Sequence, residues 1–134
     1  MNVNKALIAG FVGGIVLAVY EFLVHGLIMG GTYAKYQPLF RQDAPMFWFP
    51  IIAIILAIVA ALFFAKTRGS WEDGAKGGMM FGFWLGLIAF VAQFYNPLVY
   101  TGFPYFLSWC WGAITLIGWL ITGAVIGTLY KAES

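Results

Sequence analysis

Four long apolar segments divide the chain, and short stretches rich in charged and turn-forming residues separate them. The segments run over about 6–30, 47–65, 77–96 and 108–130. Each is long enough for an α-helix to cross the hydrocarbon core of a bilayer, which takes about 20 residues. We therefore predict an all-α polytopic membrane protein, in which residues 1–134 form a single domain of four transmembrane helices packed as a bundle.

Two prolines and a lysine bear on where these helices begin and end. Pro50 falls in the first turn of the second segment, where its missing N–H costs little. Pro97 directly follows the third segment and is expected to stop that helix. The first segment follows Lys5 as a signal peptide would, but it runs well past 15 residues without a small-residue cleavage site, so we expect it to be a retained span.

Composition narrows the class of protein further. Of the 134 residues, 63% are hydrophobic and 9% are charged, whereas a soluble domain carries about 25% charged residues. Residues 77–130 contain no Asp, Glu, Lys, Arg or His. These figures exclude a water-soluble fold. The net charge is +2, and the basic residues form no run that would indicate nucleic-acid binding. The partner that the composition does indicate is the lipid bilayer.

Lysine and arginine are unevenly divided between the two sides of the predicted bundle. One side carries five of them: Lys5, Lys66, Arg68, Lys76 and Lys131. The other side carries two, Lys35 and Arg41. Because cytoplasmic loops hold the excess of basic residues, we predict that both termini are cytoplasmic. Aromatic residues gather near the opposite side, as in an interfacial belt; a docking surface for a partner subunit or lipid is the alternative.

Small residues recur at four-residue spacing in the first and third segments, a pattern that lets membrane helices approach closely. The first segment carries Gly10, Gly14 and Ala18, and the third carries Gly78, Gly82 and Gly86, each 68 positions later. This repeat indicates two similar hairpins that run the same way through the membrane, and it predicts that the first and third spans cross closely through their glycines. Gly123 and Gly127 form a further small face, which we expect to serve self-association or docking to another membrane protein.

Two ionisable residues continue the glycine face of the first segment. At 100° per residue, Glu21 and His25 lie within an arc of about 80° with Gly10 and Gly14. Glu21 is the only charged residue inside a predicted span, and His25 is the only histidine. Their i,i+4 spacing allows a direct contact, and a close crossing of the first and third spans would bring both near Gln93. We take Glu21, His25 and Gln93 as the candidate intramembrane polar site.

Four interpretations of this polar site remain open. The side chains form a hydrogen-bonded clasp that fixes helix packing, or Glu21 carries protons in linked transport. A haem or metal ion is the third interpretation, but one histidine gives bis-histidine haem ligation only with a second chain. A carboxylate with one imidazole also falls short of the usual four zinc ligands. The fourth is a crevice for a quinone, lipid or other amphiphile. We expect no metal and no resident cofactor.

Motifs for enzymatic chemistry are absent from the sequence. Asp43 and Asp73 fall on opposite sides of the predicted bundle, so no Ser-His-Asp arrangement forms. The glycines lie in apolar helices rather than in a phosphate-binding loop. Cys110 is the only cysteine and cannot form an intrachain disulfide. No predicted span contains a lysine for Schiff-base chemistry. The sequence therefore predicts a protein that is not an enzyme.

The stretch GGIVLAVYEFLVHG, residues 13–26, together with the glycine-led third segment, resembles small four-span bacterial proteins of unknown function. In those proteins an acidic residue of the first helix is followed four positions later by Asn or His, as Glu21 is followed by His25 in this chain. The resemblance implies a bacterial inner-membrane protein and brings no activity with it.

Taken with the glycine faces, these features predict an accessory or structural subunit of a membrane complex. Such a subunit would associate with copies of itself or with partner membrane subunits through its glycine-rich helix faces. Proton-linked transport of a small solute, or channel activity, through Glu21 and His25 is the alternative function. Binding of haem or a quinone is a further alternative.

Overall fold

The computed structural model describes residues 1–131, and within that range the chain is helical and contains no strand. Four helical stretches are long and apolar enough to cross a membrane: Val3–Ile28, Trp48–Lys66, Ala75–Val99 and Tyr105–Leu129. Each begins and ends within a few residues of the corresponding predicted span. The prediction of an all-α polytopic fold is therefore confirmed.

Shorter helical elements complete these four stretches. The first consists of α1 (Val3–Glu21) and a π-helical segment, Phe22–Ile28. The chain then forms the short helix α2 (Gly30–Lys35) and a 3₁₀ turn at Gln37–Leu39 before α3 (Trp48–Lys66). A second 3₁₀ turn, Arg68–Ser70, leads to α4 (Ala75–Ala92), the short helix α5 (Tyr95–Val99) and α6 (Tyr105–Leu129).

Local chemistry explains where two of the long helices begin. Asn2 is the N-cap of α1, and its Oδ1 accepts a hydrogen bond from the backbone N–H of Lys5 at 3.0 Å. This bond satisfies one of the backbone donors that the first turn of a helix leaves free. Pro50 is the third residue of α3, still in the first turn, where the missing N–H removes no hydrogen bond of the helix.

The expectation that Pro97 stops the third span is wrong. The helical break falls earlier, at residues 93–94, and Pro97 is the third residue of α5. In the first turn of a new helix a proline removes no needed donor, so the chain stays helical through it and reaches Val99. Ser108 Oγ donates a hydrogen bond to the carbonyl oxygen of Gln93 at 3.0 Å, which satisfies one acceptor at the end of α4.

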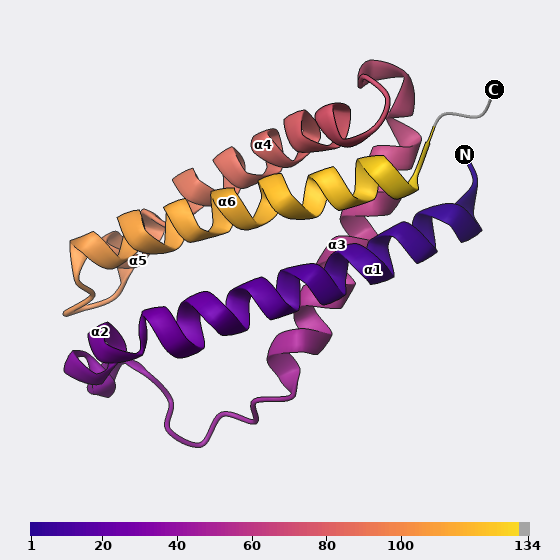
Figure 1. The fold of residues 1–134 in the computed structure, drawn as a ribbon. Coiled ribbons are helices and arrows are strands. Elements are labelled where there is room, and N and C mark those ends of the chain that lie inside the picture. Colours follow the sequence, from indigo (N-terminus) through magenta and orange to yellow (C-terminus); the bar gives the residue numbers. More distant parts are fainter. Residues whose placement is uncertain (132–134) are drawn as a thin grey trace.

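The four long helices pack in the order α3, α1, α6, α4. Helices α1 and α6 lie side by side in the middle, with α3 packed on α1 and α4 packed on α6 (Figure 1). The N-terminus and the C-terminal end of α6 lie at one end of the bundle, the terminal end, and α2 and α5 lie at the other, the connector end. Because α6 separates α1 from α4, the predicted close crossing of the first and third spans is wrong.

The glycines of the first span pack against α3. A Cβ atom placed on Gly10 would lie 2.5 Å from Ile58 Cα, and one placed on Gly14 would lie 2.5 Å from Ile54 Cα. Real Cβ atoms do not approach other atoms so closely, so only glycine permits these two backbones to touch.

The glycines of the third span are used in the same way within the second hairpin. A Cβ atom on Gly78 would meet the carbonyl oxygen of Gly123 and lie 2.8 Å from Gly127 Cα, and one on Gly86 would lie 2.8 Å from Leu116 Cα. Gly82 packs likewise on α6, between Trp119 and Gly123. Gly123 and Gly127 are therefore buried against α4, and they do not form the spare face that the sequence suggested.

The register of the two hairpins agrees with the 68-residue repeat. Shifting the contact of Gly10 with Ile58 by 68 positions gives Gly78 with Ile126, which lies between the observed contacts with Gly123 and Gly127. The contact of Gly14 with Ile54 becomes Gly82 with position 122, which lies between the observed contacts with Trp119 and Gly123. Two hairpins that arose by duplication are expected to share such a register.

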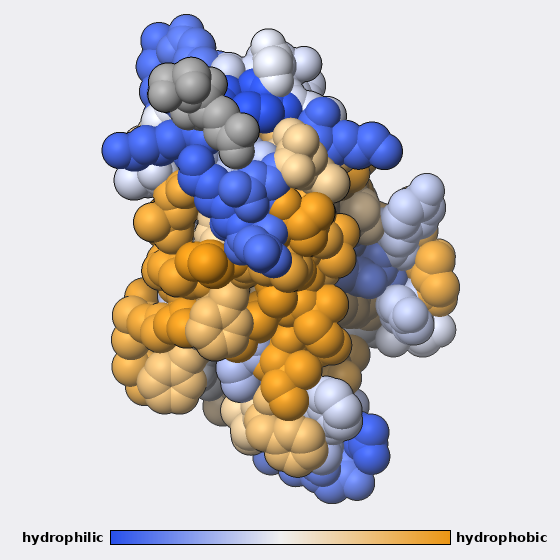
Figure 2. All heavy atoms as spheres, turned by 90° about the vertical axis from the view of Figure 1, so that its right-hand side faces the viewer, coloured by the Kyte–Doolittle hydropathy of each residue, from blue (hydrophilic) through white to orange (hydrophobic). Residues whose placement is uncertain are grey.

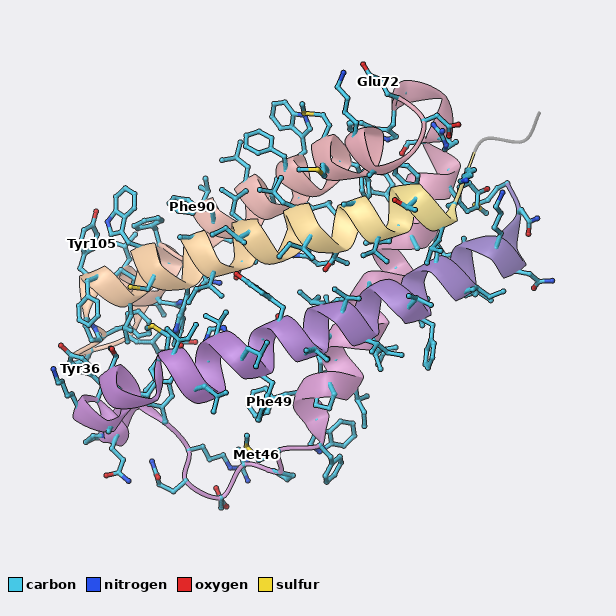
Figure 3. All side chains as sticks on the ribbon, viewed as in Figure 1. Tyr36, Met46, Phe49, Glu72, Phe90 and Tyr105 are labelled. Carbon is cyan, nitrogen blue, oxygen red and sulfur yellow. The ribbon has the colours of Figure 1, made fainter. Side chains whose placement is uncertain are left out.

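The buried core gathers at the terminal end of the bundle. Its members are mostly small or aromatic: Ala6, Ala9, Ala60, Ala61, Phe64, Ala65, Phe81, Ile126 and Tyr130. At the connector end, by contrast, residues 46–49 of the α3 region are all more than half exposed. Figure 3 shows Met46 and Phe49 below α1 on the side away from α4 and α6, and α3 crosses behind α1 rather than following its full length (Figure 1). Helix α3 thus diverges from α1 toward the connector end, whereas α6 stays packed there, with Leu107 and Ser108 fully buried.

Candidate functional site

His25 lies in the π-helical segment and is the centre of a polar cluster at the connector end. Its Nδ1 lies 2.5 Å from the hydroxyl oxygen of Tyr33, and Trp111 Nε1 donates to that same oxygen at 2.7 Å. An indole N–H can only donate, so Tyr33 Oη accepts from Trp111. The bond between Tyr33 Oη and His25 Nδ1 has its donor set by the imidazole tautomer: with the ring proton on Nε2, the Tyr33 hydroxyl donates to Nδ1.

Aromatic rings enclose this hydrogen-bonded group. The Phe40 ring lies 5.0 Å from that of Tyr33 and 6.2 Å from that of Trp111, and the Phe103 ring lies 5.4 Å from that of Trp111. Removal from water raises the pKa of the Tyr33 hydroxyl, and the hydrogen bond from Trp111 opposes that change only in part. Tyr33 therefore stays protonated at neutral pH and can donate to His25.

Glu21 is the last residue of α1 and is only partly buried. Its carboxyl group makes no hydrogen bond or ion pair within residues 1–131. The contact with His25 that the i,i+4 spacing allowed does not form, because the chain turns π-helical directly after Glu21 and His25 binds Tyr33 instead. An unpartnered carboxyl group thus lies inside a candidate membrane span.

Gln93 lies apart from these two residues. Its Oε1 accepts a hydrogen bond from Asn96 Nδ2 at 3.1 Å, and its carbonyl oxygen accepts the bond from Ser108. The predicted approach of Gln93 to Glu21 and His25 is wrong because α6 lies between α1 and α4. The candidate site is therefore Glu21 and His25 with Tyr33 and Trp111.

A second polar contact joins α1 to α6 beside Glu21. Tyr20 Oη donates to the carbonyl oxygen of Ile114 at 2.7 Å. Its ring packs on Gly118, where an added Cβ would lie 2.8 Å from Tyr20 Cε1. Further toward the terminal end, Thr122 is fully buried and its hydroxyl has no partner in the described part of the chain. The polar cluster therefore does not continue as a chain of hydrogen bonds toward that end.

Sequence reasoning did not single out Tyr33 and Trp111. Tyr33 follows His25 by eight residues, near the end of the first span. This nearness in sequence was a signal that Tyr33 could be a hydrogen-bond partner of His25. Trp111 is 78 positions further on, and only the packing of α6 against α1 brings it to Tyr33. Within residues 1–131, no three His, Cys, Asp or Glu side chains lie close enough together to hold a metal ion.

No family model, curated protein or solved structure matches this chain. The resemblance to small four-span bacterial proteins therefore stays a prediction. The features that bear on function are the polar cluster, the unpartnered Glu21 and the surfaces that the helices leave open.

Proposed function

We propose that this protein is a non-enzymatic subunit of a larger membrane assembly and that it meets its partner at Glu21. The observation that carries the proposal is the Glu21 carboxyl group, which lies within a candidate span and has no hydrogen-bond partner within residues 1–131. Polar groups inside a bilayer are costly unless they are paired, hydrated or neutralised. A partner helix that supplies a donor would satisfy this group.

The surface beside Glu21 is free for such a partner. Glu21 continues the face of α1 that carries Gly10 and Gly14. Helix α3 packs on that face at Gly10, through Ile58, and at Gly14, through Ile54. Ile51 and Ile52 of α3, toward the connector end, are 39% and 50% exposed. The glycine faces themselves are occupied by contacts within the chain, so they are not open to a partner.

A second copy of the chain is the partner that these groups suit best. Each copy offers the Glu21 carboxyl group and the His25 ring nitrogen Nε2, which makes no hydrogen bond within residues 1–131 while Nδ1 is bound to Tyr33. In a two-fold symmetric pair, residue i contacts j and residue j contacts i, so the bond between Glu21 of one copy and His25 of the other would form twice.

The oligomeric state in mild detergent and in vesicles tests this proposal. With Cys110→Ser as background, a single cysteine at position 22, beside Glu21, should cross-link two copies in the membrane. A cysteine at position 88 of α4, where the side chain is equally exposed, should not. Adding Glu21→Ala removes two such bonds and should weaken the dimer about 30-fold, since interhelical polar bonds in membranes are worth about 1 kcal/mol each. A wild-type chain that stays monomeric, or a dimer that Glu21→Ala leaves unchanged, would refute the pairing.

We further infer that the protein lies in the bacterial inner membrane with both termini in the cytoplasm. The resemblance noted above supports the first part. The second is supported by five Lys and Arg residues that flank the spans on the side of the termini, against two on the other side. Fusion of a periplasm-dependent reporter enzyme to the C-terminus should give no activity, whereas fusion within residues 36–46 should give activity. The reverse pattern would overturn the orientation.

Proton-linked transport is the second candidate, and one observation favours it. Trp111, Tyr33 and His25 form a polar connection from the connector end toward Glu21, which could give that carboxyl group access to protons from one side. No comparable connection leads from Glu21 to the terminal end within the described helices, so transport would need more than one copy. Proton flux into vesicles that contain the protein, and its loss in Glu21→Gln, would support this function; no flux in wild type would exclude it.

A further inference from the structure

A shallow apolar groove runs between α1 and α6 toward the terminal end of the bundle. It encloses about 370 Å³ and is lined by Val12, Val16, Ala124, Val125, Thr128 and Leu129. The Thr128 hydroxyl donates to the carbonyl oxygen of Ala124 at 2.8 Å, so it presents no free polar group to the groove. Val12 and Leu129 are 38% and 40% exposed. The groove is therefore open on the flank of the bundle that would face lipid.

Two lysines stand where this groove reaches the terminal end. At 100° per residue, Lys5 shares the face of α1 that carries Val12 and Val16. Lys131 follows the groove residue Leu129 by two positions. Lys5 Nζ donates to the carbonyl oxygen of Lys131 at 3.0 Å and lies 5.5 Å from the centre of the Tyr130 ring. These contacts place the Lys5 ammonium group beside the backbone of Lys131, at the terminal end of the groove.

The charge of these two lysines is not balanced within the described part of the chain. The ion pairs there join Arg41 to Asp43, Arg68 to Asp73 and Lys76 to Glu72. None of them includes Lys5 or Lys131. Figure 2, which faces the end with the termini, shows hydrophilic residues gathered there beside a hydrophobic flank. Within residues 1–131, the apolar groove thus ends at two lysines that form no ion pair.

We propose that this groove binds an anionic phospholipid, with one acyl chain along α1 and α6 and the phosphate at Lys5 and Lys131. The length agrees with one leaflet: Lys5 and Val16 are separated by about 16 Å along the helix axis, and half of the hydrocarbon core is about 15 Å thick. Basic residues beside transmembrane helices are a known means of binding anionic headgroups. A second copy of the chain fits poorly, because a symmetric pair on this face would bring four lysines together.

This lipid site does not depend on the proposed dimer. Glu21 belongs to the connector half of α1, whereas the groove and its lysines belong to the terminal half. Failure of one proposal therefore leaves the other unaffected.

Native mass spectrometry of the full chain tests the lipid site. Phosphatidylglycerol and phosphatidylcholine with identical acyl chains are added to the detergent-solubilised protein, and the bound fraction is measured. We expect phosphatidylglycerol to bind about 30-fold more tightly, since each lysine near a headgroup contributes roughly a fivefold effect. Lys5→Gln with Lys131→Gln should remove this preference. The matched control, Lys66→Gln with Lys76→Gln, removes the same charge away from the groove and should keep it.

Filling the groove tests the position of the acyl chain. Ala124→Phe should reduce binding of both lipids at least tenfold. If this variant fails to fold by circular dichroism, Thr128→Phe fills the groove from its exposed rim instead. Equal binding of the two lipids to wild type, a preference that survives loss of both lysines, or unchanged binding after the groove is filled would each overturn the proposal. Inorganic phosphate in excess should not displace the lipid; displacement would show that only a phosphate group is recognised.

Discussion

Adding one methyl group at Gly10 tests whether the glycines serve packing within the chain. A Cβ at this position would lie 2.5 Å from Ile58 Cα, whereas ordinary van der Waals contact begins at 3.4 Å. The two backbones must therefore separate by about 1 Å, and overpacking of this kind costs about 1–3 kcal/mol. Gly26→Ala is the matched control, because an added Cβ there comes no closer than 3.5 Å to a neighbouring atom, in Phe22.

Both substitutions replace a helical glycine, in α1 at Gly10 and in the π-helical segment at Gly26, and only the one at Gly10 adds an atom against α3. The assay is the free energy of unfolding in mixed detergent micelles, followed by circular dichroism. We expect Gly10→Ala to unfold more easily than Gly26→Ala by about 1–3 kcal/mol, with Gly123→Ala similar to Gly10→Ala. Equal stability of Gly10→Ala and Gly26→Ala would refute the reasoning. So would a loss of oligomer mass without a loss of stability, because the glycines would then serve assembly.

Three further outcomes are expected. Trp111→Phe removes the donor to Tyr33 and should lower the free energy of unfolding by about 1 kcal/mol, measured in the same micelles. Burial raises the pKa of Tyr33, so the folded chain favours the protonated hydroxyl. The stability that this hydroxyl contributes is full below the ordinary tyrosine pKa of about 10 and is lost as pH rises through the higher folded value. The free energies of unfolding of wild type and Tyr33→Phe should therefore converge between pH 9 and pH 12. Pro97→Ala should change stability by less than about 0.5 kcal/mol, since Pro97 occupies the first turn of α5; a larger loss would show that Pro97 fixes that turn.

The four spans could be predicted because length and hydropathy alone determine whether a helix can cross a bilayer. The glycine faces of the helices could also be predicted, since the helical period identifies the residues that lie on one face. The period does not say which neighbour that face meets, and so Gly10 and Gly78 were expected against each other rather than each against the next helix of its own hairpin.

The hydrogen bonds of the polar site could not be predicted from the sequence as the four spans could. Regular helical spacing placed Glu21 beside His25, but the π-helical turn after Glu21 changes the direction of the side chains that follow. The bond from Trp111 to Tyr33 joins residues 78 positions apart and depends on the tertiary packing of α6. An aromatic ring near the end of a span is the ordinary composition of a membrane interface, so only the nearness of Tyr33 to His25 along the chain indicated a partner, and nothing in the sequence distinguished Trp111.

The pairing of helices has a consequence for how the chain assembles during synthesis. The glycine contacts join α1 to α3 and α4 to α6, which are consecutive spans, so each hairpin can close as soon as its second helix has entered the bilayer. Such short-range closure carries a small loop-entropy cost and is fast. The contacts of α6 with α4 and with α1 both need the last helix, and the contact with α1 is the one that joins the two hairpins and brings the Asn2 N–H to the Tyr130 hydroxyl. Assembly of the monomer thus amounts to the docking of two hairpins that have already formed.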